Sequence, residues 1–359
     1  MPGTSERRNL SSRRAFLGGA LRLGAGLGAL PIVAACARAA TPASPPTAPP
    51  AAAPPATPVA QAPTARPRTV VFGTNAGGSA MGLVTSVVKR HGLDLRHGVD
   101  LDLKPFDPAD GEKAVVIGTL EVGIFVPVSW AIVNHEGQDI SFLAPIYRNH
   151  GAVLVRTDAP YQQMADLRGK KIATLGQISG LYTSMQVLMR EMGLDWEKDF
   201  QLVSGPAPAV AAALERGDVE AAVPFEPNSS LLLSTGKYRE LLNPNEAWRQ
   251  LTGSAMFLVG LAARQRWIDQ NPDTARAVKA TILDATRYIR EHPDVFEEER
   301  EALGIQSAAH LALVKQRMAD IYLPEQDPAL VRSVEEIVDR SVELGIAPAK
   351  PQKDVFVRL

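Results

Sequence analysis

The nine residues Ala165-Asp166-Leu167-Arg168-Gly169-Lys170-Lys171-Ile172-Ala173 lead from a charged turn into a short apolar run. The small-residue stretch GQISG follows at 176–180, and the chain then continues without glycine or proline until Gly193. Short apolar runs bounded by glycine are typical of buried strands, whereas longer uninterrupted stretches are typical of helices. We therefore expect a strand over 171–175, a loop, and a helix that ends near Gly193 and Leu194.

An equivalent unit begins at Thr69. The β-prone residues TVVF at 69–72 precede the turn-rich loop GTNAGGS at 73–79. The next stretch, 80–91, carries apolar residues at helical spacing, namely Met81, Val84, Val87 and Val88. This pattern predicts a second strand, glycine-rich loop and helix.

Short apolar runs alternate with longer helical patterns along the rest of the chain. Such alternation favours an α/β architecture. The runs that we expect to form strands are 99–103, 121–126, 152–156, 171–175, 201–203, 221–225 and 257–262.

Two segments repeat one pattern about a hundred residues apart. AVVIGTLE at 114–121 and ALERGDVE at 213–220 each end a helical stretch at a glycine and enter a strand. Gly118 and Gly217 therefore occupy the position after a helix where a positive φ is needed. The repetition indicates two similar lobes.

The segment 165–173 resembles the DLKGKKVA signature of the periplasmic solute-binding proteins of ABC transporters, in their two-lobe, type II form. The chain is most similar to the branch that binds nitrate, aliphatic sulfonates, taurine and thiamine precursors, which includes proteins like thiamine-pyrimidine synthases. The resemblance covers roughly 69–346 and includes FEP at 225–227 and RQRWIDQNPDTARAVKA from Arg264.

This resemblance implies an α/β fold of two lobes with two crossovers and a ligand cleft between the lobes. Lobe one would comprise 69–150 and 258–359, and lobe two would comprise 151–257. Strand ends and helix N-termini from both sheets would converge on the ligand, which suits them for backbone hydrogen bonding. Closure over the ligand would be a hinge motion.

The candidate ligand-binding residues follow the expected strand ends and helix starts. In lobe one, glycines in the first loop would let a ligand approach the backbone, and an indole could stack on a flat ligand. These candidates are Asn75, Gly77, Ser79, Ser129, Trp130, Tyr147 and Asn149. In lobe two, Ser179 would cap a helix whose free N–H groups could bind an oxygen, and the candidates are Ser179, Gly180, Tyr182, Thr183, Phe225, Glu226 and Asn228.

Each of these positions also has a structural interpretation. The first loop could be a plain turn, Trp130 could be a core residue, and Glu226 could bond to the local backbone. The aromatic candidates favour a flat heterocycle, such as a thiamine-pyrimidine precursor or a riboflavin-like compound, over a sulfonate, taurine or nitrate. Anion sites can be built from helix N-termini alone, so the paucity of lysine in the loops leaves both ligand classes open.

The charge and motif content argue against other functional classes. Residues 1–68 hold eight Arg and one Glu, which leaves 30 basic and 38 acidic side chains in 69–359. An acidic folded region disfavours nucleic acid as a partner. No motif of a hydrolase or metalloprotease occurs, each of the six His is expected at the surface, and no cofactor or metal is predicted. A thiamine-pyrimidine synthase would need a cysteine-rich motif, and this chain has a single cysteine. A sensor that presents its loaded state to a membrane kinase remains an alternative to an importer component.

The N-terminal residues are predicted to be an export signal. Arg13 and Arg14, followed by an apolar run, resemble a twin-arginine signal. The run ends in VAAC at 33–36, which resembles a lipobox, so 1–36 would be a lipoprotein signal with Cys36 as the lipidated residue. ARA at 37–39 is an alternative cleavage site for ordinary signal peptidase.

A linker is expected to follow the signal. In 37–68, 22 of 32 residues are Ala or Pro, a composition typical of an extended, semi-rigid linker. We therefore expect a monomer tethered to the outer face of the cell membrane, with a small-molecule ligand and with permease and ATPase subunits as partners.

Overall fold

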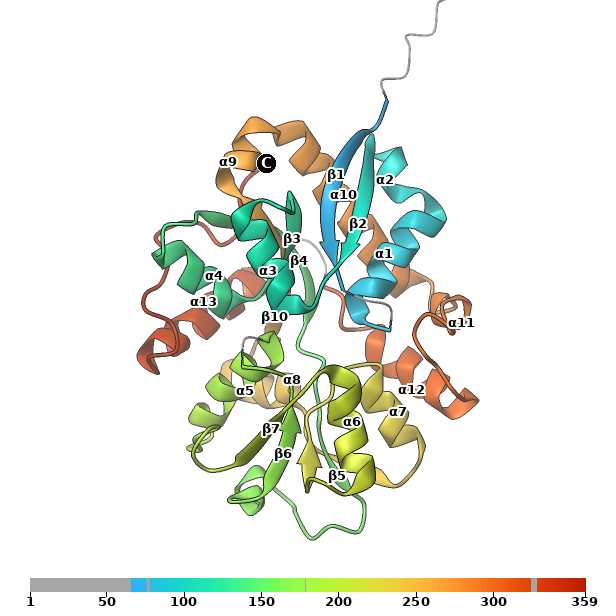
Figure 1. The fold of residues 1–359 in the computed structure, drawn as a ribbon, viewed down its shortest axis with the longest axis vertical. Helices are drawn as coiled ribbons and strands as arrows, with labels where there is room; N and C mark the ends of the chain where they lie inside the picture. The colour runs from blue at the N-terminus through green and yellow to red at the C-terminus, as the bar shows by residue number, and fades with distance from the viewer. Residues whose placement is uncertain (1–65, 76–77, 178, 324–327) are drawn as a thin grey trace, which may run out of the picture. The chain divides into compact units, whose positions relative to one another are not determined.

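Two five-stranded sheets organise the part of the chain that the computed structural model describes, residues 66–75, 78–177, 179–323 and 328–359 (Figure 1). The predicted signal, Cys36 and nearly all of the linker lie outside the described residues, as does Gly77. Both sheets belong to one compact unit of the chain, Pro63–Leu359.

The first sheet has the strand order β2-β1-β3-β10-β4 and defines lobe one. The strand β1 runs parallel to β2 and β3, whereas β10 runs antiparallel to both β3 and β4. The strands are β1 (Arg68–Thr74), β2 (Val99–Pro105), β3 (Val122–Phe125), β4 (Ile140–Arg148) and β10 (Phe257–Arg264).

The second sheet repeats this plan with the order β7-β6-β8-β5-β9 and defines lobe two. Here β6 is parallel to β7 and β8, and β5 is antiparallel to β8 and β9. The strands are β5 (Val153–Arg156), β6 (Lys171–Thr174), β7 (Gln201–Ser204), β8 (Ala221–Ala222) and β9 (Tyr238–Leu242). The expected α/β fold with two lobes is confirmed, and the sequence patterns missed β4 and β9.

Helices connect the strands of each lobe. The helices on the lobe-one side are α1 (Ala80–His91), α2 (Leu93–Arg96), α3 (Pro108–Ile117), α4 (Pro127–His135), α9 (Gln265–Gln270), α10 (Pro272–Glu291) and α11 (Val295–Glu298). Lobe two contains the short 3₁₀ helix η1 (Met164–Leu167), α5 (Gly180–Glu191), α6 (Ala207–Arg216), α7 (Asn228–Ser234) and α8 (Pro244–Thr252). Within the described part of the chain, every helix is too short or too polar to span a bilayer.

The predicted helix ends have the expected local chemistry. Ser79 caps α1 by accepting a hydrogen bond from the backbone N of Gly82, and Ser179 caps α5 in the same way through the N of Tyr182. Gly118 and Gly217 follow α3 and α6 with φ of 88° and 76°. The two repeated segments therefore do occupy equivalent places in the two lobes.

The C-terminal helices α12 (Ala308–Met318) and α13 (Pro328–Glu343) are not confined to lobe one, where the sequence analysis placed 258–359. Helix α12 lies beside α7 of lobe two (Figure 1), and His310 Nε2 is 3.1 Å from the carbonyl O of Pro227. Helix α13 contacts both lobes, because Ser333 Oγ accepts a hydrogen bond from the N of Phe257 and Arg340 pairs with Glu191. Helical periodicity does not specify the sheet on which a helix packs, so the sequence could not reveal this.

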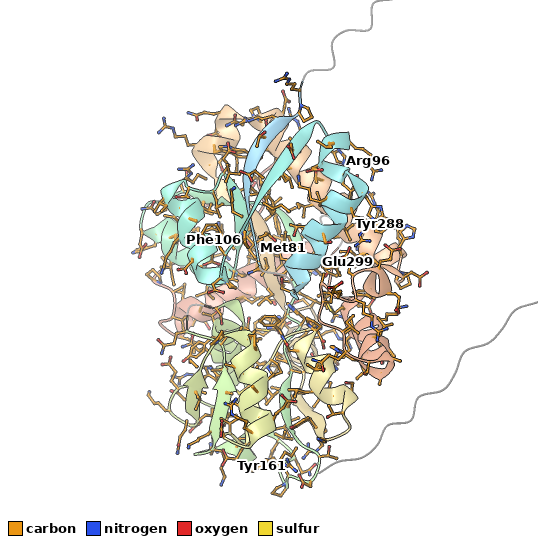
Figure 2. All side chains as sticks on the ribbon, turned by 45° about the vertical axis from the view of Figure 1, so that its right-hand side comes forward. Met81, Arg96, Phe106, Tyr161, Tyr288 and Glu299 are labelled. Carbon is orange, nitrogen blue, oxygen red and sulfur yellow. The ribbon has the colours of Figure 1, made fainter. Side chains whose placement is uncertain are left out.

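Two clusters of buried apolar side chains pack between sheets and helices: one covers the α1 and α10 side of lobe one, and the other contains residues of α4 and α13 together with the core of lobe two. In α1, Met81 is fully buried, as its helical spacing predicts (Figure 2). In lobe one, Phe142 packs against Phe257 and Phe356 with ring centroids 6.0 and 5.9 Å away. Each fully buried side chain of this size contributes about 1.5–3 kcal/mol to stability. These cores hold the strand ends in place.

Candidate functional site

Three strands of lobe one end at the same edge of their sheet. Phe72 of β1 pairs with Val122 of β3, and both Phe125 of β3 and Pro145 of β4 pair with Gly260 of β10. Strands β3 and β4 are therefore parallel and separated by one strand, about 10 Å apart. The residues that follow β1 and β3, and the last residues of β4, share this edge.

The corresponding edge of lobe two carries the start of α5 and the segment after β8. Ala173 of β6 pairs with Ala222 of β8, so both strands end together. An isolated bridge joins Gly151, in the crossover from lobe one, to Phe225. This edge therefore brings the α5 N-terminus, Phe225 and the crossover close together.

The two edges contact each other where α5 begins. A Cβ built on Gly180 would lie 2.4 Å from Val126 Cγ1 and 3.2 Å from Leu258 Cδ1, so only glycine fits here without a shift. The N of Asn149 donates to the carbonyl O of Met256 at 2.7 Å, which ties the two crossovers together. The first turn of α5 therefore packs directly against lobe one.

An aromatic cluster lies at the crossover beside these edges. The rings of Tyr147 and His150 have centroids 5.1 Å apart, those of His150 and Phe225 are 5.8 Å apart, and those of Tyr147 and Tyr322 are 6.3 Å apart. The Tyr322 hydroxyl donates to the carbonyl O of Ala80 in the first turn of α1 at 3.0 Å. The cluster thus joins the start of α1 to lobe two.

Burial sets the charge of this cluster. Desolvation lowers the pKa of His150 to about 4, so the imidazole is neutral at pH 7, and it raises the pKa of Tyr147. His150 is half-buried, and His310 is 1% exposed, so the expected surface position is wrong for His310. The sequence missed Tyr322 altogether, because only the tertiary fold brings it to Tyr147.

Glu112 is a further residue that the sequence analysis missed. It lies in α3, and its Oε1 accepts a hydrogen bond from the N of Val126 at 3.0 Å, where β3 ends. The Ser129 hydroxyl also donates to this carboxylate. Burial is the largest effect on Glu112 and raises its pKa to about 8, although the two donors oppose it. No spacing in the sequence connects Glu112 to Val126, so only the fold identifies this position.

Two of the aromatic candidates are buried and form hydrogen bonds within the protein. Trp130 is 2% exposed, and its Nε1 donates to the carbonyl O of Ile140 at 2.9 Å inside the lobe-one core. Tyr182 is also 2% exposed, packs against Trp196, and donates from its hydroxyl to Glu197 Oε1 at 2.8 Å. Burial and the bond to Glu197 raise the pKa of Tyr182 to about 12. Neither ring is available to a solute in this structure.

The carboxylate of the Glu226 candidate is engaged in an ion pair with Arg317. It is 1% exposed, and its Oε1 accepts from Arg317 Nε of α12 at 2.5 Å, while Arg317 also pairs with Glu240 at 2.6 Å. Desolvation raises the pKa of Glu226, and the nearby Arg317 guanidinium opposes that rise. Glu226 thus anchors α12 on lobe two.

Two more candidates already form hydrogen bonds with other groups of the protein. Thr183 donates to the carbonyl of Gly180 at 3.2 Å, within its own helix. Asn149 Oδ1 accepts from the N of Gly151 at 3.0 Å and is buried. These contacts stabilise the α5 start and the crossover and leave the side chains little capacity for a solute.

The remaining candidates stay at the two edges. Asn75 follows β1 and Asn228 begins α7, and both are half-buried. The caps Ser79 and Ser179 hold the starts of α1 and α5, and Ser129 lies in the first turn of α4 beside Glu112. With Gly180, Tyr147 and Phe225 they form the set that stays proposed.

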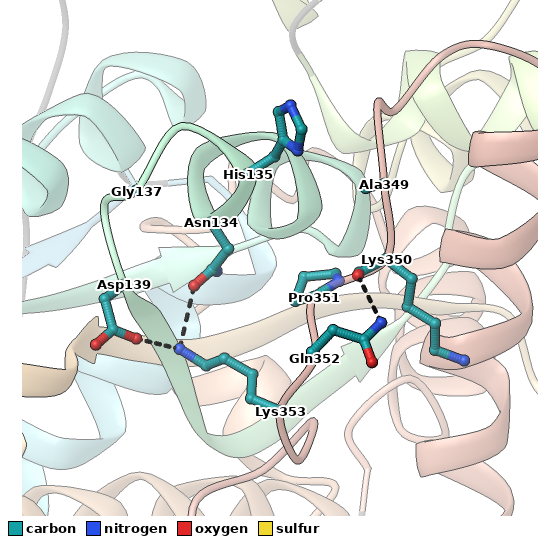
Figure 3. A pocket seen from close by; sticks show the side chains of 9 residues that line it. All are labelled: Asn134, His135, Gly137, Asp139, Ala349, Lys350, Pro351, Gln352 and Lys353. Atoms are coloured by element: carbon teal, nitrogen blue, oxygen red, sulfur yellow. Dashed lines mark hydrogen bonds and ion pairs between the residues drawn. The ribbon is translucent and has the colours of Figure 1, made fainter.

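A surface hollow of about 420 Å³ lies elsewhere, between the end of α4 and the C-terminal segment (Figure 3). Lys353 Nζ there contacts Asp139 Oδ1 at 2.6 Å and Asn134 Oδ1 at 3.1 Å. Its charge is therefore already neutralised, and this hollow is not the candidate site. Within the described residues, no group of three or more His, Cys, Asp or Glu side chains could hold a metal ion.

Solved structures with this arrangement include several periplasmic binding proteins. The aliphatic sulphonate binding protein SsuA from Escherichia coli aligns with a TM-score of 0.62 at 19% identity, over 80% of this chain and 96% of that chain. The alkanesulfonate-binding protein SsuA from Xanthomonas axonopodis pv. citri aligns with a TM-score of 0.64 at 18% identity, over 79% and 96%. These likenesses show the shared fold.

Sequence comparison gives the family. The taurine-binding periplasmic protein of Escherichia coli (strain K12) is 25% identical over 210 residues, which are 58% of this chain and 63% of the length of that protein. A family model described as NMT1/THI5 like matches residues 88–295. The chain therefore belongs to the NMT1/THI5-like family, and its two-lobed α/β fold is the one that periplasmic binding proteins share.

Proposed function

We propose that this chain is the extracytoplasmic solute-binding component of an ABC importer and that it holds a small organic solute between its two lobes. The observation that carries this proposal is the meeting of two sheet edges, each with a serine-capped helix start, at the crossovers. Backbone N–H groups at such starts bind oxygen atoms of a ligand, and two crossover segments suit a hinge.

The family relationship supports the same function. The relatives that this chain resembles are named as binding proteins for taurine and aliphatic sulfonates. Import by such a system requires permease and ATPase subunits, which we propose as the partners. We also propose that lipidation at Cys36 tethers a monomer to the outer face of the cell membrane through the Ala/Pro-rich linker.

The aromatic cluster supports a flat heterocycle as the solute. Tyr147, His150 and Phe225 offer ring faces and edges at the junction of the lobes, and stacking on such rings favours planar ligands. A thiamine-pyrimidine precursor or a riboflavin-like compound fits this environment better than a sulfonate, taurine or nitrate. The support now comes mainly from Phe225, which is half-buried, since Trp130 and Tyr182 lie in the cores and Tyr147 is 5% exposed.

A thermal-shift screen of the purified chain tests the proposal. The panel comprises taurine, alkanesulfonates, nitrate, pyrimidine precursors of thiamine and riboflavin. A solute present at about 100 times its Kd and bound only by the native state should stabilise the protein by about 2.7 kcal/mol. Stabilisation by a pyrimidine or riboflavin supports the heterocycle, and stabilisation by a sulfonate alone refutes it while keeping the binding function. A folded protein that responds to none of them counts against this set of solutes.

A further inference from the structure

Glu112 is half-buried and has no cationic partner among the described residues, whereas each of the three fully buried acidic residues has one. Asp94 pairs with Lys89 at 2.5 Å, Glu226 with Arg317 at 2.5 Å, and Glu299 with Arg90 at 2.7 Å. These three acids are at most 2% exposed. Glu112 is instead held by two neutral donors, the backbone N of Val126 and the hydroxyl of Ser129.

The position of Glu112 places its carboxyl group beside the junction of the lobes. Its hydrogen-bond partner Val126 is the residue whose side chain abuts Gly180 at the start of α5. The side chain of Glu112 retains partial exposure even though protein atoms surround it. A carboxyl group without a counter-charge is costly in such a place, and a solute that supplies a donor would lower that cost.

Two arginines near this junction are engaged elsewhere. Arg317 pairs with Glu226 and Glu240, and Arg148 Nε donates to the carbonyl O of Asp320 at 2.8 Å. An anionic solute beside Glu112 would therefore gain no free guanidinium from these two residues. An N–H group of a solute would instead add a third donor to the carboxylate.

We propose that Glu112 is a specificity-determining residue that accepts a hydrogen bond from an N–H group of the solute and disfavours anionic solutes. This inference rests on the proposed binding function and narrows its ligand class to solutes with an N–H donor and no net negative charge. Because burial raises the pKa of Glu112 to about 8, the carboxyl group is mostly protonated at pH 7, and the discrimination against anions is expected near and above pH 8, where the carboxylate predominates. An N–H donor, by contrast, stabilises the ionised form.

Three pairs of compounds that differ mainly in charge test this inference at pH 8.5. They are propanesulfonamide and propanesulfonate, nicotinamide and nicotinate, and riboflavin and riboflavin 5′-phosphate, with Kd measured by calorimetry on the full chain. For at least one pair the uncharged member should bind at least 10-fold more tightly than the anion, since a hydrogen bond to a charged group commonly has this effect. Glu112→Gln should reduce that preference about 10-fold.

The matched control is Glu136→Gln, which removes one negative charge from an exposed position at the end of α4 in the same lobe. It should leave the preference unchanged. Tighter binding of the anionic members overturns the inference and leaves the proposed function standing. The inference about Glu112 is also overturned if uncharged members bind and Glu112→Gln leaves their affinity unchanged. If none of the six compounds binds, the result counts against both the proposed function and this inference.

If the Glu112→Gln variant fails to fold, a second measurement on the unaltered chain still tests the inference. On the unaltered chain, the uncharged compound that binds is compared with its analogue in which the N–H groups are replaced by N–CH₃. The analogue should bind at least 10-fold more weakly, and equal affinity refutes the role of Glu112 as the acceptor.

Discussion

Replacing Arg317 by methionine should destabilise the protein strongly, because it leaves a buried carboxylate without its partner. Glu226 is 1% exposed and lies 2.5 Å from Arg317 Nε, so the charge would stay in a low-dielectric environment. Breaking a buried ion pair from one side costs about 3–5 kcal/mol. The Arg317 side chain is 21% exposed, so we expect the lower end of this range, about 3 kcal/mol.

The loss should depend on pH in a definite direction. Without Arg317, the pKa of Glu226 rises further above its value in the unfolded chain, because only the hydrogen bonds from Ser230 then oppose desolvation. The folded variant therefore binds more protons than the unfolded chain, and its stability falls as pH rises. The difference between Arg317→Met and the unaltered protein should be smaller at pH 5 than at pH 8.

Urea denaturation followed by circular dichroism at both pH values measures these free energies. Arg216→Met is the matched control, since Arg216 pairs with Asp218 at exposures of 61% and 54% and should contribute less than about 1 kcal/mol. Adding Glu226→Gln to Arg317→Met should restore part of the stability. A loss below about 1 kcal/mol for Arg317→Met, or a loss that does not shrink at pH 5, would refute the assignment of a buried ion pair.

Four further outcomes are expected. Gly180→Val should force its side chain against Val126 and cost about 1–3 kcal/mol in urea denaturation, and an unchanged midpoint would contradict the close contact. Trp130→Ala should lower the free energy of unfolding by about 3–5 kcal/mol. An unchanged free energy of unfolding together with lost solute binding would show that this ring belongs to the site and not to the core. Tyr147→Phe keeps the buried ring and should change stability by about 1.5 kcal/mol or less yet weaken solute binding measured by calorimetry, and unaltered affinity would remove Tyr147 from the site. Glu112 has a pKa of about 8 in the folded state, above its value in the unfolded chain, so its contribution to stability falls as pH rises towards 8. The fall should be at most about 1.4 kcal/mol per pH unit. Glu112→Gln should therefore flatten the pH dependence of the free energy of unfolding, and an equal slope in both proteins would contradict the raised pKa.

The sequence predicted the local structure well because local structure depends on near neighbours. The run at 171–175 became β6, and the serine before α5 became its cap. Gly118 and Gly217 end their helices with positive φ in both lobes, as the repeated segments indicated. The expected strand over 221–225 is short, Ala221–Ala222, since Pro224 cannot donate a hydrogen bond to a sheet.

The candidate residues were predicted by their position along the chain, and only the fold decided which of their side chains are buried and which partners they contact. Residues 130 and 182 both follow expected strand ends, but helical geometry turns Trp130 and Tyr182 into the cores. Glu226 follows a strand end as well, yet its carboxylate is neutralised by Arg317, which lies 91 positions further along the chain.

By itself, the sequence of this protein determined the two-lobed α/β fold, the caps of its helices and the family to which it belongs. These features follow from periodicity, turn chemistry and short motifs, all of which are local. The tertiary structure alone placed Glu112 against Val126, brought Tyr322 to Tyr147, and fastened α12 to lobe two. Such contacts join residues far apart in the chain, and burial then sets their charge, so no pattern of neighbouring residues encodes them.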